Sequence, residues 1–215
     1  MSSPFYSIIL PTFNRAHLLP RAIQSVFDQD FEDWELIIVD DGSSDETSQI
    51  LHTMKTKDRR IRTLVNPHQG IAKTRNSAID LTQGSYVTFI DSDDEYLPKH
   101  LSQHANYLQQ NQEVDMCRSN PEVVGDPYVP DFEDNHKKIH IHQCVLGSTF
   151  IIKSEILKRM GGYPNLSFGE DTEFWRMATK MGFTQAVSPY QSYRYYRTET
   201  DSICNRLINK LNNEN

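Results

Sequence analysis

The stretch VTFIDSDDEYLP places carboxylates directly after a short apolar run. Residues 87–90 have the composition of a buried strand, and Asp91, Asp93, Asp94 and Glu95 follow its carboxyl end. In an α/β sheet, ligands bind at that end of the strands. Like charges this close together raise one another's pKa, so the group favours a bound cation. Carboxylate oxygens suit Mg²⁺ or Mn²⁺, which usually bind together with substrate phosphates. The alternative is a solvated acidic turn before a helix.

Polar residues follow two earlier apolar runs in the same way. The run YSIIL is closed by Pro11 and Thr12, with Asn14 in the turn that follows, and the run LIIV is followed by Asp40. Both runs are typical of buried parallel strands. Asp40 is therefore placed to accept a hydrogen bond from a base or a ribose.

Two helix starts follow predicted strands. Ser43 and Glu46 have the spacing of a capping box, which predicts a helix beginning after Ser43. The pattern over residues 70–81 predicts another helix, with Arg75 in its early turns. Lys73 and Arg75 could both be solvated helix surface, which is the better interpretation for Lys73. At a helix start that faces strand ends, Arg75 could instead meet a phosphate or a base.

Strand-like and helix-like segments alternate from residue 6 to residue 110. This regularity predicts an α/β fold with a parallel, doubly wound sheet. Neither GxGxxG nor GxxxxGK[ST] follows any predicted strand, so the two commonest phosphate-binding fingerprints are absent from the sequence.

Length and charge narrow the functional classes. The chain has 215 residues, enough for one substantial α/β domain. Its net charge of -7 argues against binding along a nucleic-acid backbone. There is no apolar run of roughly 18 residues or more and no signal peptide pattern, which predicts a soluble, cytoplasmic protein. The 3 cysteines are widely spaced and indicate neither a disulfide framework nor a CxxC metal site.

Five blocks of the sequence resemble glycosyltransferase family 2, whose members have the GT-A fold. They are SIILPTFNR, ELIIVDDGSSDET, GIAKTRNSAI, YVTFIDSDDEYLP and FGEDTEFWRM, and they occur in the family's order between Ser7 and Met177. The resemblance implies a Rossmann-like, doubly wound, mainly parallel sheet with helices on both faces. It also implies inverting sugar transfer, dependent on Mn²⁺ or Mg²⁺, from a nucleotide diphosphate donor, expected to be a UDP-sugar. The acceptor would be a hydroxyl group in polysaccharide, lipopolysaccharide or other cell-surface glycan synthesis.

The resemblance also implies which residues bind the donor. They are Pro11, Thr12, Asn14, Asp40, Arg75, Asp91, Ser92 and Asp93. Among them, Asp40 would read the base and Arg75 would contact the nucleotide. Asp91 and Asp93 would hold the ribose and the metal ion with the diphosphate, and Asp94 would orient this pair.

The resemblance assigns the chemical step to Asp171. This residue matches the family's aspartate that removes the proton from the acceptor hydroxyl as its oxygen attacks the sugar. Glu170, Gly147 and Ser148 are expected close to the acceptor. Without the resemblance, Asp171 reads as a capping charge in the first turn of a helix that begins near Gly169.

We expect one GT-A domain over residues 1–204, with a nucleotide-binding half at 1–118 and an acceptor-binding half at 119–204. The segment 119–142 lacks periodicity and is predicted to be a functional excursion. In the tail, residues 205–215, apolar residues at helical spacing favour a frayed helix or a homodimer contact over a membrane anchor. The expected partners are the nucleotide-sugar donor and a glycan or lipid-linked acceptor, with no nucleic acid; a peripheral position at a membrane stays open.

Three other functions fit part of the pattern. A nucleotidyltransferase also uses strand-end acids with Mg²⁺, but normally has a glycine-rich basic loop near its first strand, which PTFNRAH is not. A haloacid-dehalogenase-like phosphatase carries its DxD on the first strand, whereas here it follows the fourth. A nucleotide-sugar-binding protein without turnover stays open, although the retained Asp91, Asp93 and Asp171 argue against it.

Overall fold

A computed structural model describes residues 3–134 and 136–199, together with 202, 204, 205 and 207. Its elements, in chain order, are β1 (Tyr6–Thr12), α1 (Leu19–Phe27), β2 (Trp34–Asp40), α2 (Thr47–Lys57), β3 (Ile61–Val65), α3 (Ile71–Ile79), β4 (Tyr86–Phe89), β5 (Glu95–Tyr96), α4 (His100–Gln110), β6 (Met116–Ser119), β7 (Glu122–Gly125), β8 (Tyr128–Pro130), β9 (Lys138–His140), the 3-10 helices η1 (Ile141–Gln143) and η2 (Gly147–Thr149), β10 (Ile151–Lys153), α5 (Ser154–Met160), α6 (Glu170–Lys180), β11 (Gln185–Ser188) and β12 (Tyr193–Arg197). Of the predicted tail 205–215, all but Asn205 and Leu207 lies outside the described residues.

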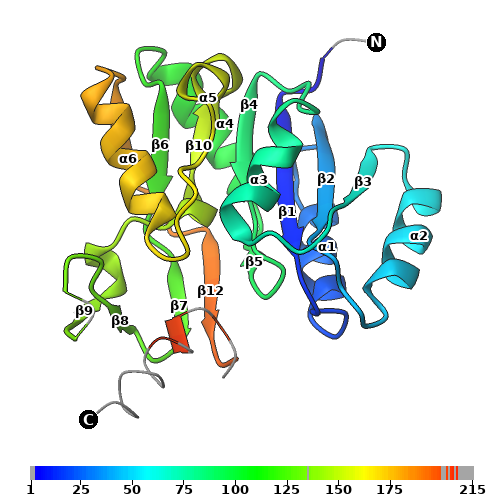
Figure 1. Ribbon diagram of the computed structural model, residues 1–215. Coiled ribbons are helices and arrows are strands. Elements are labelled where there is room, and N and C mark those ends of the chain that lie inside the picture. The colour runs from blue at the N-terminus through cyan, green and yellow to red at the C-terminus, as the bar shows by residue number, and fades with distance from the viewer. Residues whose placement is uncertain (1–2, 135, 200–201, 203, 206, 208–215) are drawn as a thin grey trace.

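The main sheet has the strand order β11-β6-β10-β4-β1-β2-β3 (Figure 1). Strands β1 to β4 run parallel, β11 runs parallel to β6, and β10 is antiparallel to both of its neighbours. The prediction of an α/β fold with a mainly parallel sheet is confirmed. One antiparallel strand from the second half of the chain therefore joins β6 and β11 to the strands of the first half.

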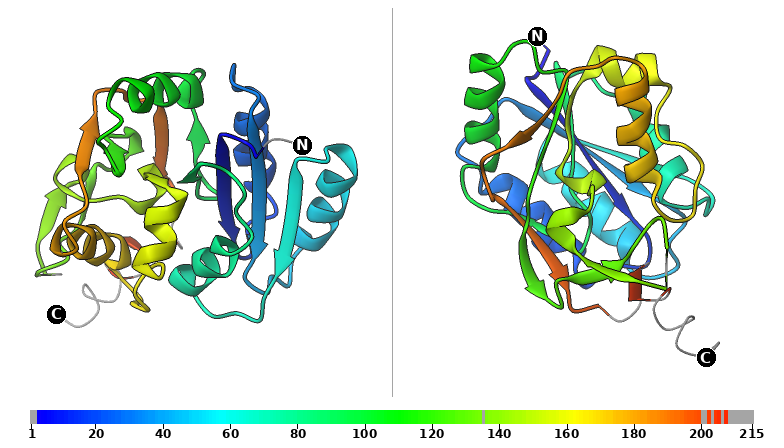
Figure 2. Two further views of the ribbon diagram at one scale, coloured as in Figure 1. Left: turned by 90° about the horizontal axis from the view of Figure 1, so that it is seen from above. Right: turned by 90° about the vertical axis from the view of Figure 1, so that its left-hand side faces the viewer.

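Helices cover both faces of this sheet, as the view from above in Figure 2 shows. Successive residues of β1 point to opposite faces. Ile8 and Leu10 pack in a core with residues of α1 and α4, whereas Ile9 packs in a second core with residues of α3, α5 and α6. All seven residues of β1 are buried, as expected of a central strand in a parallel sheet.

A smaller sheet, β5-β12-β7, lies at the carboxyl ends of the central strands, beside the hairpin of β8 and β9 (Figure 1). Strand β12 pairs with β5, which directly follows the acidic turn after β4, and with β7 from the predicted excursion. The excursion is thus anchored next to the acidic turn by backbone pairing.

The capping box predicted at Ser43 and Glu46 is wrong. Helix α2 begins at Thr47, and the Ser43 hydroxyl instead accepts a hydrogen bond from the Asn14 backbone at 2.8 Å. At the start of the helix, the Thr47 backbone N–H donates a hydrogen bond to the Asp45 carboxylate at 3.1 Å. The Ser43 hydroxyl therefore joins the two loops that follow β1 and β2.

None of the helices described is both long enough and apolar enough to cross a bilayer.

The central strand gives the first prediction. Ile9→Ala removes a fully buried side chain between β1 and the α3 side of the core, and we expect the free energy of unfolding to fall by about 2–5 kcal/mol. Urea unfolding measures this change. Val65→Ala, at a side chain that is 63% exposed on the edge strand β3, is the matched control and should change stability by no more than about 0.5 kcal/mol. Equal losses in the two variants would contradict this account of the core.

Candidate active site

A cavity of about 1170 Å³ opens at the carboxyl ends of β1, β2 and β4. Its wall continues along the start of α3, the start of α6 and the β8–β9 hairpin. The two halves of the chain therefore contribute to one hollow. A volume of this size is sufficient for a ligand larger than a single sugar.

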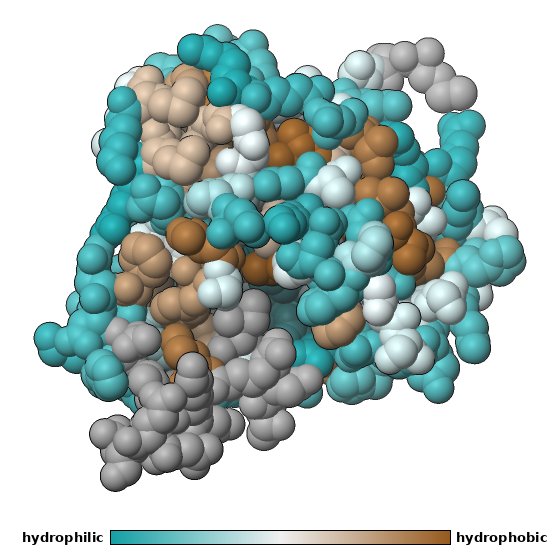
Figure 3. Space-filling view, in the orientation of Figure 1, coloured by the Kyte–Doolittle hydropathy of each residue, from teal (hydrophilic) through white to brown (hydrophobic). Residues whose placement is uncertain are grey.

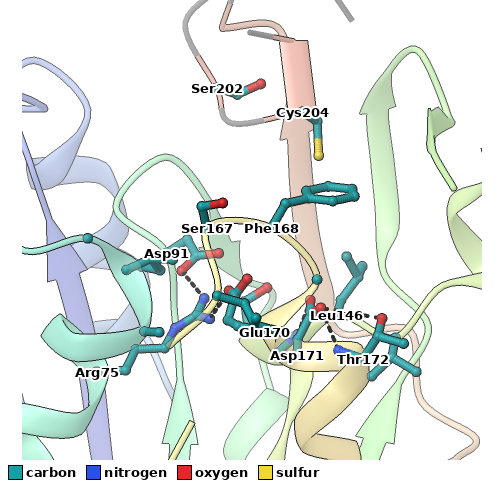
Figure 4. A pocket seen from close by; sticks show the side chains of 18 of the residues that line it. Arg75, Asp91, Leu146, Ser167, Phe168, Glu170, Asp171, Thr172, Ser202 and Cys204 are labelled. Carbon is teal, nitrogen blue, oxygen red and sulfur yellow. Dashed lines mark hydrogen bonds and ion pairs between the residues drawn. The ribbon is translucent and has the colours of Figure 1, made fainter. Parts of the chain in front are cut away.

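The buried guanidinium of Arg75 joins the two sides of this cavity. Arg75 is only 3% exposed; its Nη2 donates to Asp91 Oδ1 at 2.9 Å and its Nη1 donates to Glu170 Oε1 at 3.0 Å. Figure 4 shows Arg75 between these two carboxylates. Charge-assisted hydrogen bonds are strong and directional, so Arg75 fixes the end of β4 relative to the start of α6.

Asn76, the next residue of α3, makes a second connection to the same region. Its side-chain Nδ2 donates to the Tyr163 carbonyl at 2.8 Å, and its Oδ1 accepts from the Tyr163 N–H at 2.7 Å. The Tyr163 ring lies 5.3 Å from the Arg75 guanidinium carbon. Asn76 thus fixes the backbone between α5 and α6, and sequence reasoning did not identify this role.

Asp171 occupies the first turn of α6, directly after Glu170. Its Oδ2 accepts from the Gly147 N–H at 3.1 Å and its Oδ1 from the Thr172 N–H at 2.7 Å. Burial, followed by the negative charge of Glu170, raises the pKa of Asp171 to about 7, and the two backbone donors and Arg75 act in the opposite direction. Such a carboxylate can accept a proton near neutral pH.

Gly147 allows the backbone to lie this close to Asp171. A Cβ atom at position 147 would lie 3.0 Å from Asp171 Cβ and 3.2 Å from Arg75 Nη1. Ordinary carbon contacts are longer, so a side chain here would displace one of the two groups. Gly147 and Ser148 line the cavity, as does Asp171.

Asp94 anchors the acidic turn after β4 to strand β12. This residue is fully buried, and its carboxylate accepts from the Tyr193 hydroxyl at 2.7 Å and from the Tyr196 N–H at 2.8 Å. Burial and the nearby charge of Asp93 raise the pKa of Asp94 well above its usual range. The Asp91 N–H also donates to the Tyr193 hydroxyl, at 3.2 Å. Tyr193 and Asp94 together set the path of the turn that presents Asp91 and Asp93.

The acids of this turn fit a divalent cation that also binds a phosphorylated ligand. Burial and repulsion by Asp91 raise the pKa of Asp93 to about 6, while Arg15 lowers it. A cation would relieve that repulsion. Within the described part of the chain, no cluster of three or more His, Cys, Asp or Glu is arranged to hold a metal. Asp93 and the free oxygen of Asp91 therefore need further oxygen ligands, such as phosphate oxygens, to complete a Mg²⁺ or Mn²⁺ site.

Most of the residues predicted from the sequence line this cavity. They are Pro11, Thr12, Arg75, Asp91, Ser92, Asp93, Gly147, Ser148, Glu170 and Asp171. Asn14 and Asp40 do not. The Asn14 side chain accepts from the Ser44 N–H at 2.8 Å, and the Asp40 carboxylate, in a residue that is 2% exposed, accepts from the Ser43 N–H at 2.9 Å. Both side chains support the loops behind the wall, and their direct contact with the donor stays a prediction.

Asp41 lies in the wall where Asp40 was expected. Its carboxylate accepts from the Gln69 and Gly70 N–H groups, each at 3.0 Å, and lies 2.8 Å from His68 Nδ1. Phe13, also in the wall, stacks on His68 with ring centroids 4.0 Å apart. The sequence signal was the Asp40-Asp41 doublet, but its pattern does not tell which of the two side chains points outward.

Comparison of the sequence with known proteins gives three findings. The profile of Glycosyl transferase family 2 matches residues 7–161. A Haemophilus influenzae protein described as an uncharacterized glycosyltransferase is 37% identical over 94% of this chain and 83% of its own length. The Escherichia coli UDP-Glc:alpha-D-GlcNAc-diphosphoundecaprenol beta-1,3-glucosyltransferase WfgD is 26% identical over 98% of this chain and 84% of its own length.

Among solved structures, Staphylococcus aureus TarS 1-349 in complex with UDP-GlcNAc superposes with a TM-score of 0.76. The two chains are 24% identical, and the match covers 94% of this chain and 60% of the TarS chain. At this identity the likeness establishes a common fold.

The Arg75 bridge gives the second prediction. In Arg75→Lys a single ammonium cannot bind both carboxylates as the guanidinium fork does, so one buried acid loses its partner. We expect the free energy of unfolding to fall by roughly 1–3 kcal/mol. Lys73→Ala, an exposed charge on the same helix, is the control and should be nearly neutral in urea unfolding. A stability of Arg75→Lys equal to that of the wild type would refute the bridge.

Proposed function

The chain belongs to glycosyltransferase family 2 and has the GT-A fold, and on this premise we propose that it transfers a sugar from a UDP-sugar to an acceptor hydroxyl in cell-surface glycan synthesis. The observation that carries this proposal is the single cavity lined by Asp91, Asp93 and Asp171, with Arg75 between the two sides. Family membership removes the nucleotidyltransferase and phosphatase alternatives.

The relatives support the choice of substrates. The name of the Escherichia coli protein gives a UDP-glucose donor and a diphosphoundecaprenol-linked acceptor, and TarS was crystallised with UDP-GlcNAc. From these we propose a UDP-sugar donor and a glycan or lipid-linked acceptor for this chain. The chain spans 60% of the length of the TarS chain.

The donor would occupy the half of the cavity formed by β1, β2, α3 and the acidic turn. Pro11, Thr12 and Asp41 line the part at the ends of the first two strands, where we place the nucleoside. Asp91, Ser92 and Asp93 line the part that we assign to the ribose and the diphosphate. Asp93, with Asp91, would hold Mn²⁺ or Mg²⁺ here, and the bound ion would neutralise negative charge on the departing diphosphate.

The acceptor would approach from the side of α6. We propose that Asp171 removes the proton from the acceptor hydroxyl as its oxygen attacks the anomeric carbon from the face opposite the diphosphate, which inverts that centre. The Gly147 and Thr172 N–H groups hold the Asp171 carboxylate, so its orientation does not depend on the substrate. Glu170, paired with Arg75, would act by positioning Asp171.

A donor screen tests the proposal. Release of UDP, GDP or dTDP from the corresponding sugar nucleotides is measured with Mn²⁺, with Mg²⁺ and with a chelator, in the presence of a mixture of glycan and lipid-linked acceptors. We expect metal-dependent release from at least one UDP-sugar. Tight nucleotide binding without turnover of any donor would instead favour a binding protein.

Asp171→Asn separates chemistry from donor binding. The amide keeps the shape of the side chain but cannot take a proton, so we expect transfer to fall by about 10²–10⁴-fold. The affinity for UDP with Mn²⁺, measured by calorimetry, should stay within a few fold of the wild type. Glu173→Gln, in the same helical turn but outside the cavity wall, is the control and should retain activity. Equal loss of turnover and UDP affinity in Asp171→Asn would contradict the role of Asp171.

The pKa of Asp171 predicts how the rate depends on pH. The carboxylate acts as a base only when it is deprotonated, and its pKa is raised to about 7. At saturating substrate, the rate should therefore rise with pH, reach half its plateau near that value, and stay flat above it. A rate that is constant between about pH 5 and 8, where a free aspartic acid is already ionised, would contradict the assignment.

Asp93 should control the metal-dependent part of donor binding. Its pKa of about 6 means that protons compete with the cation below that pH, so UDP affinity in Mn²⁺ should weaken as the pH falls through this range. Asp93→Asn should abolish the gain in UDP affinity that Mn²⁺ gives to the wild type. Calorimetry with and without Mn²⁺ measures both effects, and an undiminished gain in the variant would refute the site.

A further inference from the structure

The cavity has two chemically different walls. The wall on the side of the acidic turn is charged and polar, whereas the wall beyond Asp171 is largely apolar and aromatic. The apolar residues of the second wall are Val129, Phe132, Ile139, Leu146, Phe168 and Trp175. Figure 3 shows apolar surface in the region where α6 and the β8–β9 hairpin lie in Figure 1. Nothing in the proposed donor explains this wall, because a nucleotide diphosphate is highly polar.

Two aromatic rings lie at the centre of the apolar wall. Phe132 comes from the loop of the β8–β9 hairpin and Phe168 from the loop before α6, and their centroids are 6.5 Å apart with a tilt of 47°. Figure 4 shows the Phe168 ring on the side of the cavity where Asp171 and Leu146 lie. Neither Phe132 nor Phe168 is fully buried, so both can present ring surface to a ligand.

The geometry of Gly169 fixes these rings relative to Asp171. Gly169 has a φ of 73°, which favours glycine, and the Phe132 ring occupies the space that a Cβ at position 169 would need. Phe168, Gly169, Glu170 and Asp171 are consecutive. The packing of Phe132 on Gly169 therefore joins the Phe132 ring to the short segment that carries both Phe168 and Asp171.

The charges on this wall disfavour an anionic ligand. Among the described residues of this wall, the basic side chain is that of Arg176. Arg176 is ion-paired with Glu133, and its guanidinium carbon lies 5.4 Å from the centre of the Phe132 ring. Asp131 also lines the wall, and Asp171 lies at its inner end. A phosphate bound here would meet these carboxylates, and Arg176 is already paired with Glu133, whereas a neutral ring would meet no such repulsion.

We propose that Phe132 and Phe168 form a platform for the apolar face of a pyranose, so that, in the glycan or lipid-linked acceptor, the acceptor hydroxyl is carried by a sugar unit with no phosphate against this wall. Pyranoses have C–H faces that pack on aromatic rings while their hydroxyls point sideways, and the platform directs one hydroxyl to Asp171. This inference rests on the proposed function, because it names the class of acceptor for the same site.

Binding without turnover tests the platform. The full chain, with UDP and Mn²⁺ bound, is titrated with the methyl glycosides of glucose, galactose and N-acetylglucosamine and with their 6-phosphates, and saturation-transfer NMR reports contact between sugar C–H groups and protein rings. We expect at least one neutral glycoside to bind, with saturation strongest on one face of the ring, and its 6-phosphate to bind at least about tenfold more weakly, a change of 1.4 kcal/mol.

Variants at three positions sharpen the result. Phe168→Ala should lower the affinity for the neutral glycoside by about tenfold. Phe168→Tyr, which keeps the ring, should bind it as the wild type does. Glu133→Gln frees Arg176 and removes one negative charge, so it should raise the affinity for the 6-phosphate. Met181→Ala, an exposed apolar residue outside the cavity wall, is the control and should change nothing.

Two outcomes overturn the platform. One is an affinity of the wild type for a 6-phosphate that equals its affinity for the corresponding neutral glycoside. The other is an affinity for the neutral glycoside that Phe168→Ala leaves unchanged. Hydrolysis of the UDP-sugar is measured in parallel samples that contain the UDP-sugar in place of UDP and no glycoside, so it reports the donor side without the platform. Retained hydrolysis with failed glycoside binding therefore rejects the platform but keeps the proposed function, whereas absence of UDP-sugar turnover with every acceptor rejects the proposed function.

Discussion

The site depends on one buried cation between two carboxylates. Burying a charge is unfavourable unless it is paired, and Arg75 meets this requirement through Asp91 on one side and Glu170 on the other. The three members of this ionic bridge, Arg75, Asp91 and Glu170, come from α3, from the turn after β4 and from the first turn of α6. Because the guanidinium fork is rigid, these elements cannot shift independently. The cavity thus has a fixed spacing between its two acidic sides.

The same burial explains why the acids of the site differ in their chemistry. Asp91 is paired with Arg75, whereas burial close to other acids raises the pKa of Asp93 to about 6 and that of Asp171 to about 7. In our account, Asp93 recovers its charge when a cation binds, and Asp171 gains a proton from the acceptor. One set of neighbouring carboxylates can therefore serve cation binding on one side and proton transfer on the other.

Sequence reasoning predicted the sheet, the strand-end position of the acids and the convergence of Asp91, Asp93 and Asp171 on one cavity, because the periodicity of strands and helices and the order of the family blocks determine these features. It named Asp40 for contact with the base and did not identify Asp41, which lines the wall, since the direction of a side chain just beyond a strand end depends on the local backbone. It also did not find the Phe132 and Phe168 pair, because two aperiodic loops distant in sequence bring these rings together and no local pattern marks them.

The most direct measurement of the central claim is a double-mutant cycle on kcat/KM for the UDP-sugar, with Arg75→Lys, Glu170→Gln and the double variant. If Arg75 sets the spacing of the site through Glu170, the two changes act on one interaction. We expect Arg75→Lys to cost less in the Glu170→Gln background than in the wild type, with a coupling of about 0.5–3 kcal/mol. Strictly additive effects would show that Arg75 and Glu170 act independently and would contradict the account.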